Sequence, residues 1–352
     1  MLSVSQSESL SRTAEFWDRE HFSPEMQRAE WQNHPLAHER MMRLLGGRLR
    51  ERWFVETYLP VGGVNRGLGI GVGTGATEME ILGSGAVRHY DLWDVSTAGL
   101  AAAREHAARY GMADRITTNV GDIQAADLGD ERYDLITFIA SLHHMADLDG
   151  VLAKCHRALK LGGVLWAAEY IGPDRFDYPN EHTRLARDMF HGIDSALKKS
   201  WEPALRFPTP DEVIAADPTE SVHSSEIPAA IARHFEQIET TPTYGSFAFI
   251  MFWGLNHDAI YERPEGEALV RAILAIDEAL IDSGRLPHYF AHIVARKTTA
   301  RQHGGAQVGI KLLSRLYRPL DRFRSMIRTK LVRPREGAPE VLFSRNGIGG
   351  DG

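Results

Sequence analysis

From residue 65 onward, short apolar runs alternate with longer amphipathic segments. Five runs have the length of buried strands and are bounded by Gly or Asp: 66–71, 87–93, 115–120, 133–140 and 163–170. Amphipathic helical patterns lie between them, at 97–109 and 147–160. This alternation predicts an α/β fold with a parallel, doubly wound sheet and right-handed crossovers.

The flanking segments have different patterns. Residues 1–60 read as a helical cap anchored by Trp17, Trp31 and Trp53, and residues 61–172 form the core. Residues 173–223, rich in Pro, Asp, Arg and aromatics, read as a substrate insertion. The segment 224–299 completes a seven-stranded sheet, with a helix at 224–234, strands at 235–241 and 288–297, and a helical insertion at 246–286.

Composition narrows the class of protein. The chain has 352 residues, enough for about two domains or one core with additions. Its single cysteine, Cys155, excludes a disulfide scaffold and a Cys-based zinc cluster. Residues 1–20 contain no apolar segment typical of a signal peptide, and the apolar run 246–255 is too short to span a bilayer. We therefore expect a soluble, cytoplasmic protein.

Charge is unevenly distributed along the chain. The net charge is −7, but ten basic residues and one acid give 301–335 a charge of +9, and 336–352 carries −2. Residues 1–300 therefore carry −14, which disfavours a nucleic-acid substrate. In the tail 300–352, the stretch 308–332 has a basic amphipathic pattern interrupted by Pro319. It fits peripheral contact with an anionic membrane, packing on the acidic body, or a homodimer contact.

A glycine-rich stretch, 67–75, gives the strongest local signal. It follows a strand and precedes a helix that begins near Thr77 and Glu78, so its backbone amides can approach a ligand closely. Gly71, Gly73 and Ala76 also fit the dinucleotide-binding pattern, which keeps an NAD-dependent oxidoreductase as an alternative. No Tyr/Lys or His/Asp arrangement for hydride transfer is visible.

Acidic residues follow the next strands at spacings that suit a nucleoside ligand. Asp94 ends the strand after the glycine loop, where a carboxylate can accept hydrogen bonds from ribose hydroxyls. It can equally cap the helix that begins near Ser96, and Asp91 is a weaker candidate within the strand. Gly121 and Asp122 follow the third strand.

With the stretch Ser141–His144 and the turn 157–163, these motifs occur in the order found in a known family. Over residues 60–172 the chain resembles the class I S-adenosylmethionine-dependent methyltransferases, which have a Rossmann-like fold. The resemblance implies S-adenosylmethionine as cofactor, with the methionine part at the glycine loop, the ribose at Asp94 and the adenine at Asp122. The cofactor-binding residues it implies are Gly71, Gly73, Thr74, Gly75, Asp94, Val95, Gly121, Asp122, Ile123 and Ala140.

One position departs from the family pattern. The family has an acid two residues before the first loop glycine, and this chain has Gly69 there. Glu78 or Glu80 could take over the contact with the cofactor's ammonium group. The departure also keeps open a non-catalytic module that uses the methyltransferase fold for binding.

Candidate catalytic residues follow the fourth and fifth strands. His143 and His144, or Glu169, could be the general base that an alcohol acceptor needs. The histidines could instead merely line the cofactor pocket, and Glu169 could cap a helix or pair with Arg175. No metal centre is expected, because His38 and Glu39 are not followed by a second His at ligand spacing.

The substrate is inferred from weaker signals. His182 and Arg184 of the insertion could contact it, although a solvated loop face also explains them. The segments 169–176, 221–227 and 291–297 are similar to bacterial methyltransferases of glycan and natural-product pathways, so we expect O-methylation of a sugar or other small-molecule hydroxyl. If the tail contacts the inner face of a membrane, a lipid-linked glycan fits better.

Overall fold

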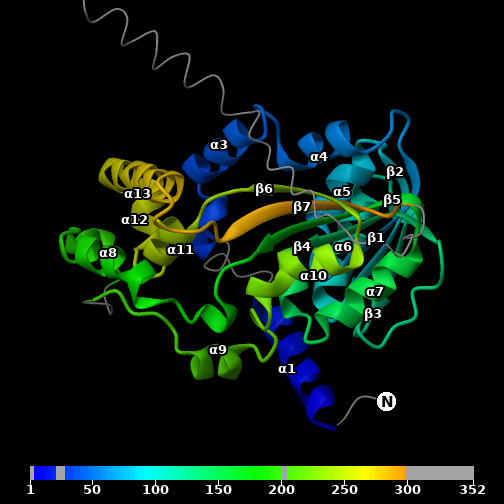
Figure 1. Cartoon of the computed structure of the whole chain (residues 1–352), viewed down its shortest axis with the longest axis horizontal. Helices are drawn as coiled ribbons and strands as arrows, with labels where there is room; N and C mark the ends of the chain where they lie inside the picture. Colours follow the sequence, from blue (N-terminus) through cyan, green and yellow to red (C-terminus); the bar gives the residue numbers. More distant parts are fainter. Residues whose placement is uncertain (1–3, 21–27, 200–203, 299–352) are drawn as a thin grey trace, which may run out of the picture. The chain divides into compact units, whose positions relative to one another are not determined.

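A seven-stranded sheet organises the part of the chain that the structure describes. The computed structural model describes residues 4–20, 28–199 and 204–298, all within one unit, Met1–Ala306. The strand order is β3-β2-β1-β4-β5-β7-β6 (Figure 1). The strands are β1 Val64–Ile70, β2 Val87–Asp94, β3 Ile116–Val120, β4 Tyr133–Ile139, β5 Leu159–Tyr170, β6 Gln237–Pro242 and β7 Phe290–Arg296.

The sheet is parallel except at β7, which runs antiparallel to both β5 and β6. The predicted α/β, doubly wound, seven-stranded, Rossmann-like fold is therefore confirmed. The strand order reverses between β1 and β4, and ligands of such sheets bind at the carboxyl ends of the strands beside this point. The antiparallel β7 departs from the all-parallel order of dinucleotide-binding sheets, which disfavours the NAD alternative.

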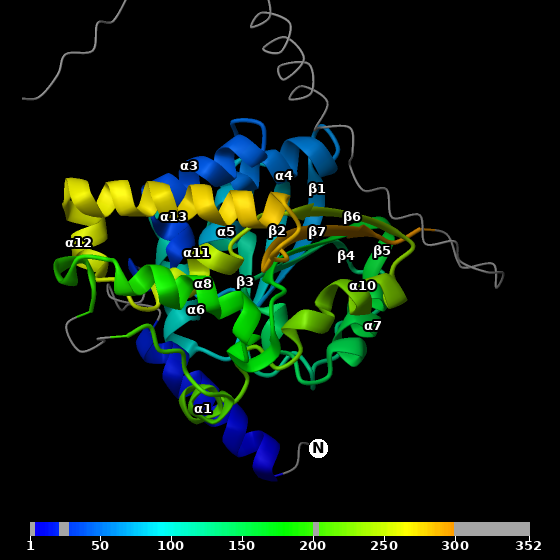
Figure 2. The same ribbon diagram turned by 60° about the vertical axis from the view of Figure 1, so that its left-hand side comes forward.

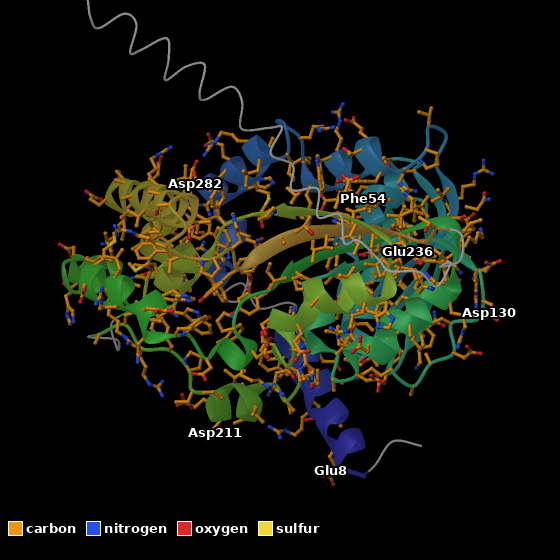
Figure 3. The ribbon with its side chains drawn as sticks, viewed as in Figure 1. Glu8, Phe54, Asp130, Asp211, Glu236 and Asp282 are labelled. Carbon is orange, nitrogen blue, oxygen red and sulfur yellow. The ribbon has the colours of Figure 1, made fainter. Side chains whose placement is uncertain are left out.

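Helices cover both faces of the sheet because strand side chains alternate between the faces. Along β5, Leu165 and Ala167 pack with α7 (Leu148–Ala158) and α10 (Ile227–His234). Val164 and Trp166 face the opposite core, with α4 (Arg50–Tyr58), α5 (Ala76–Gly83) and α6 (Thr97–Arg109). There Phe54 stacks on Trp166 with ring centroids 4.2 Å apart. Figure 3 labels Phe54 on α4.

A third, aromatic core lies beyond the ends of β5 and β7. It is formed by helices from distant parts of the chain, grouped beside the sheet in Figures 1 and 2: α3 (Pro35–Leu44), α8 (Asn180–His191), α11 (Ser246–Phe252), α12 (His257–Glu262) and α13 (Pro264–Asp282). Tyr170 and Phe290, at the ends of β5 and β7, belong to this core. The described chain also contains α1 (Val4–Glu20) and α9 (Pro210–Ala216).

Most predicted elements are found close to their expected bounds, and α6 matches the predicted helix 97–109. One strand differs: β5 begins at Leu159, because Tyr133 pairs with Leu159 before the register shifts to Leu135 and Val164. In the described residues, no helix combines the length and apolar character needed to cross a bilayer. The tail 300–352, with its predicted amphipathic stretch, lies outside the described residues.

Candidate active site

The glycine loop between β1 and α5 has a backbone that only glycine adopts easily. Gly71, Gly73 and Gly75 have φ values of 64°, 52° and 67°. A Cβ on Gly71 would lie 2.5 Å from the Cβ of Ser141, at the end of β4. Gly75 precedes the first residue of α5, whose free amides face the loop. The loop is thus a close-fitting cradle of backbone amides.

Asp94 braces this loop from the end of β2. The amide of Gly73 donates to its Oδ2 at 2.6 Å, and the amide of Ser96 donates to its Oδ1 at 2.7 Å. Ser96, not Asp94, caps α6 by accepting a hydrogen bond from Gly99, so the helix-cap alternative for Asp94 is wrong. A ribose hydroxyl would use the remaining lone pairs of the Asp94 carboxylate.

The weaker candidate, Asp91, has a structural role. It is buried and accepts hydrogen bonds from Arg66 at 2.9 Å and from the Tyr133 hydroxyl at 2.8 Å. These contacts tie β2 to β1 and β4 within the sheet.

The other predicted cofactor residues lie at the same edge of the sheet. The amide of Gly121 donates to the carbonyl of Asp94 at 2.9 Å, and Asp122 accepts from the amide of Gln124 at 2.8 Å. Ala140 follows β4 with φ 52°. Hydrogen bonds connect the ends of these strands, so Gly71–Gly75, Asp94, Gly121 and Ala140 lie near one another at this edge of the sheet.

The place of the missing family acid is filled by Glu78. A Cβ on Gly69 would lie 2.6 Å from Val72 Cγ1 and 3.0 Å from Glu78 Cγ. Glu78 is buried and accepts a hydrogen bond from Thr137 at 2.8 Å, and burial raises its pKa. Glu80 is exposed. Of the two predicted substitutes, only Glu78 is placed beside Gly69.

Glu169 orients one of the predicted catalytic histidines, His143. Its Oε1 accepts from the amides of Ser141 and Leu142 at 2.9 and 2.8 Å, and its Oε2 lies 2.7 Å from His143 Nδ1. The two bonded amides lie at the start of the short 3-10 turn Leu142–His144. Arg175 donates instead to the carbonyl of Glu220 at 2.8 Å.

His143 and His144 lie side by side, with ring centroids 4.3 Å apart. Burial disfavours the charged form of His143, but its hydrogen bond with Glu169 and the nearby carboxylates outweigh burial and raise its pKa to about 9. Burial and the charge of His143 lower the pKa of His144. The Nδ1 of His144 lies 3.0 Å from Thr219 Oγ1 and 3.6 Å from Asp217 Oδ2.

Two acids that sequence reasoning missed complete this group. The Nε2 atoms of His143 and His144 lie 3.6 and 3.8 Å from the carboxylate of Glu220. The amide of Val222 donates to the carbonyl of His143 at 3.0 Å, which fixes the loop 217–222 beside the histidines. Asp217 and Glu220 stand in an ordinary Pro-containing turn sequence, so no signal in the chain pointed to them.

Helix α1 covers this edge of the sheet. Asp18 accepts from Ser96 Oγ at 2.7 Å and from the amide of Ala98 at 3.0 Å. Trp17 Nε1 donates to Asp217 Oδ2 at 3.1 Å, and its ring packs edge-on against His144. The predicted N-terminal cap thus contacts both the cofactor edge and the catalytic candidates.

A cavity of about 600 Å³ lies between the sheet edge and the aromatic core. It reaches Ala140, His143, His144 and Glu169. Eight aromatic side chains form part of its walls: Phe16, Trp17, Tyr170, Phe176, Phe249, Phe252, Trp253 and Phe290. His182, bonded to the Tyr289 hydroxyl, and the exposed Arg184 are not among its lining residues.

His292 of β7 also lines the cavity and was missed by sequence reasoning. It is 4% exposed, and neither ring nitrogen has a hydrogen-bond partner among the described residues. The position looks like ordinary strand sequence, so only the fold reveals a buried imidazole here.

Comparison with known proteins gives a family match over part of the chain. Residues 68–165 match the model of a family described as a methyltransferase domain. Over this segment the chain is similar to class I S-adenosylmethionine-dependent methyltransferases. A demethylmenaquinone methyltransferase of Bacteroides fragilis is 28% identical over 130 residues, which are 36% of this chain and 53% of the relative. A sterol 24-C-methyltransferase of Aspergillus fumigatus is 32% identical over 101 residues, 28% and 27% of the two chains.

The chain spans about half the length of the first of these relatives and about a quarter of the second. Among solved structures, it is similar to phosphoethanolamine N-methyltransferase 2 of Haemonchus contortus in complex with S-adenosylmethionine, with a TM-score of 0.48 and 16% identity. That alignment covers 81% of this chain and 60% of the other.

The residues present fit the cofactor of this family, S-adenosylmethionine. The loop around Gly71 is a cradle that a Cβ would fill, and carboxylates at Asp94 and Asp122 follow the adjoining strands. These residues would hold the cofactor's methionine, ribose and adenine parts.

Proposed function

We propose that the protein transfers the methyl group of S-adenosylmethionine to a hydroxyl of a small molecule, with a sugar or glycan as the preferred acceptor. One observation carries this proposal: a single cavity contains both Ala140, beside the cofactor loop, and the imidazoles of His143 and His144. Its volume of about 600 Å³ suits a small ligand.

The lining suits a ring that carries hydroxyl groups. Aromatic walls such as Trp17 and Trp253 can pack against the apolar C–H faces of a sugar. Carboxylates and imidazoles, including Glu220 and His292, can bond to its hydroxyls. The relatives are named for demethylmenaquinone and for carbon 24 of sterols, so a larger apolar acceptor is an alternative that the aromatic residues of the lining also favour.

The side chains of the cavity have separate tasks in such a reaction. Bound S-adenosylmethionine supplies an electrophilic methyl group on a sulfonium. The cavity walls align the acceptor oxygen for in-line displacement. Glu169 has both oxygens bonded, so it positions His143, and the proton of the hydroxyl is removed at the imidazole pair. Asp217 and Thr219 position His144.

Calorimetry with S-adenosylhomocysteine followed by a methyl-transfer screen on sugars tests the proposal. We expect stoichiometric binding by the wild type and weaker binding by Asp94→Ala. His144→Asn and Glu169→Gln should retain binding but lose about 10²- to 10⁴-fold in turnover. A folded protein that binds no S-adenosylhomocysteine would instead be a non-catalytic binding module.

The remaining expectations concern the tail. Contact of 308–332 with a membrane, and with it a lipid-linked glycan as acceptor, stays a prediction, as does a homodimer.

A further inference from the structure

Three side chains in the cavity converge on one point. One donor atom from each of His143, His144 and Glu220 lies within 4.8 Å of the other two. The Glu220 carboxylate is 3.6 Å from His143 Nε2 and 3.8 Å from His144 Nε2. Bonds of about 2.0–2.2 Å to one metal ion would separate such donors by roughly 3.0–3.5 Å. The Glu220 carboxylate is thus close to the separation that a shared ion requires from each imidazole.

The other ring nitrogen of each imidazole, Nδ1, already has a partner within the protein. Glu169 binds His143 Nδ1 at 2.7 Å, and Thr219 with Asp217 binds His144 Nδ1. Metal-ligating histidines almost always have a carboxylate, carbonyl or similar partner on the other nitrogen, which fixes the ring and increases its basicity. Ser221 Oγ donates to Glu220 at 2.8 Å, which steadies the third donor.

The charge balance also favours a cation. Glu169, Asp217 and Glu220 place three carboxylates around the two imidazoles. No Lys or Arg among the described residues forms an ion pair with any of them. Buried charges need a partner of opposite sign or a metal. Arg175 interacts electrostatically with Asp217 and Glu220 while its guanidinium donates to the Glu220 carbonyl, so one arginine faces a group of three carboxylates.

We propose that His143, His144 and Glu220 form a binding site for a divalent transition-metal ion, and that Glu169 and Asp217 orient the two imidazoles from their Nδ1 atoms. Two imidazole nitrogens and one carboxylate oxygen suit zinc, iron, manganese or cobalt rather than magnesium or calcium. Three protein ligands leave coordination positions open toward the cavity, as catalytic sites require.

The role that we assign to the ion rests on the proposed methyl transfer to a hydroxyl. An ion at this point would bind the acceptor's hydroxyl oxygen and lower the pKa of the hydroxyl. The O–H proton then passes to water, the O–CH₃ bond forms and the S–CH₃ bond breaks, without any change in oxidation state. In this arrangement the imidazoles hold the ion, and water accepts the proton in their place.

The test uses the full chain, freed of metal with a chelator and titrated with Co²⁺ and Zn²⁺. We expect one equivalent of Co²⁺ to give visible absorption bands of a nitrogen- and oxygen-ligated ion, which Zn²⁺ removes. Glu220→Gln and His144→Asn should abolish this equivalent, and Glu169→Gln should weaken it about 10- to 100-fold.

Glu226→Gln is the matched control. Glu226 belongs to a second group of three potential ligands, with Asp174 and His223, but its side chain is 55% exposed. Its substitution should leave Co²⁺ binding unchanged. Absence of stoichiometric binding, or equal binding by wild type and the Glu220 and His144 variants, would overturn the proposal.

Titration of the same samples with S-adenosylhomocysteine separates the two hypotheses and confirms that each variant is folded. Cofactor binding without metal binding leaves the methyltransferase proposal standing and refutes the metal site. Metal binding without cofactor binding refutes the proposed function and retains the site.

Discussion

Two regions of the molecule meet at the cavity, and they are built on different principles. The cofactor region, formed by the carboxyl ends of β1 to β4, depends on backbone conformation within short stretches such as Gly71–Gly75. The acceptor region, formed by α3, α8, α11 to α13 and the loop 217–222, depends on side chains that join distant segments. Arg40 with Asp277 and Thr13 with Asp217 are two such pairs.

This difference explains where similarity to known proteins is found. The family match covers residues 68–165, which includes the cofactor region and excludes the acceptor helices. A loop held by glycine geometry tolerates few alternatives, because a side chain would strain it. Contacts between distant side chains can be replaced by other pairs, so the acceptor region can diverge with the substrate.

The first prediction tests whether one buried carboxylate holds the acceptor region together. Asp277 is fully buried; it pairs with Arg40 at 2.9 Å and accepts hydrogen bonds from the amides of Gly245, Phe247 and Ala248. Asp277→Ala would leave a buried guanidinium unpaired, so we expect a loss of about 3–5 kcal/mol in the free energy of unfolding. Urea denaturation measures this loss.

The control lies on the same helix. Glu267 pairs with Arg271 at the surface of α13, with both side chains more than half exposed. Glu267→Ala should therefore cost less than about 1 kcal/mol. Similar losses in the two variants would show that Asp277 does not have this role.

The second prediction tests the cofactor region through its backbone. Gly71→Ala places a methyl group 2.5 Å from the Cβ of Ser141 at a φ of 64°. The strain of about 1–3 kcal/mol should displace the loop and weaken S-adenosylhomocysteine binding roughly 5- to 150-fold in calorimetry. Gly83→Ala, at the end of α5 with nothing within 4 Å of the added Cβ, should leave binding unchanged. Equal affinities for all three proteins would mean that the loop does not hold the cofactor.

The same contrast determines what the sequence could predict. Gly71, Asp94 and Asp122 were predictable because each follows a strand directly, and parallel strands bring their ends to one edge. Helix α6 was predictable because its apolar positions repeat within the helix itself. Glu220 was not, since it meets His143 only after a long insertion has folded back.

The local sequence pattern also suggested a wrong structure or contact in two places. The Gly-containing stretch 159–163 reads as a turn, but it pairs with β4 through an irregular register and begins β5 at Leu159. Arg175 follows Glu169 closely and suggested an ion pair, yet it bonds to the Glu220 carbonyl. Closeness in the sequence did not predict the contacts of residues whose partners lie in the acceptor region.

The third and smallest expected effect concerns His292, where the two regions share a wall. Its ring lies 5.3 Å from that of Trp53 and 5.8 Å from that of Trp166, and burial together with Arg50 lowers its pKa to about 3. The unfolded chain binds a proton on this imidazole below a pKa of about 6.5, whereas the folded protein does not. Its contribution to stability is therefore complete above pH 6.5 and is lost as the pH falls toward 3.

Urea unfolding at pH 7.5 and 5.5 measures this contribution. His292 should account for a loss of about 1.4 kcal/mol between the two pH values, and His292→Phe should reduce the pH-dependent loss by that amount. An unchanged pH dependence in the variant would mean that the imidazole binds a proton within the fold. In that case water would reach His292 in the wall between the two regions. The contrast between the cofactor region and the acceptor region would then not hold at β7.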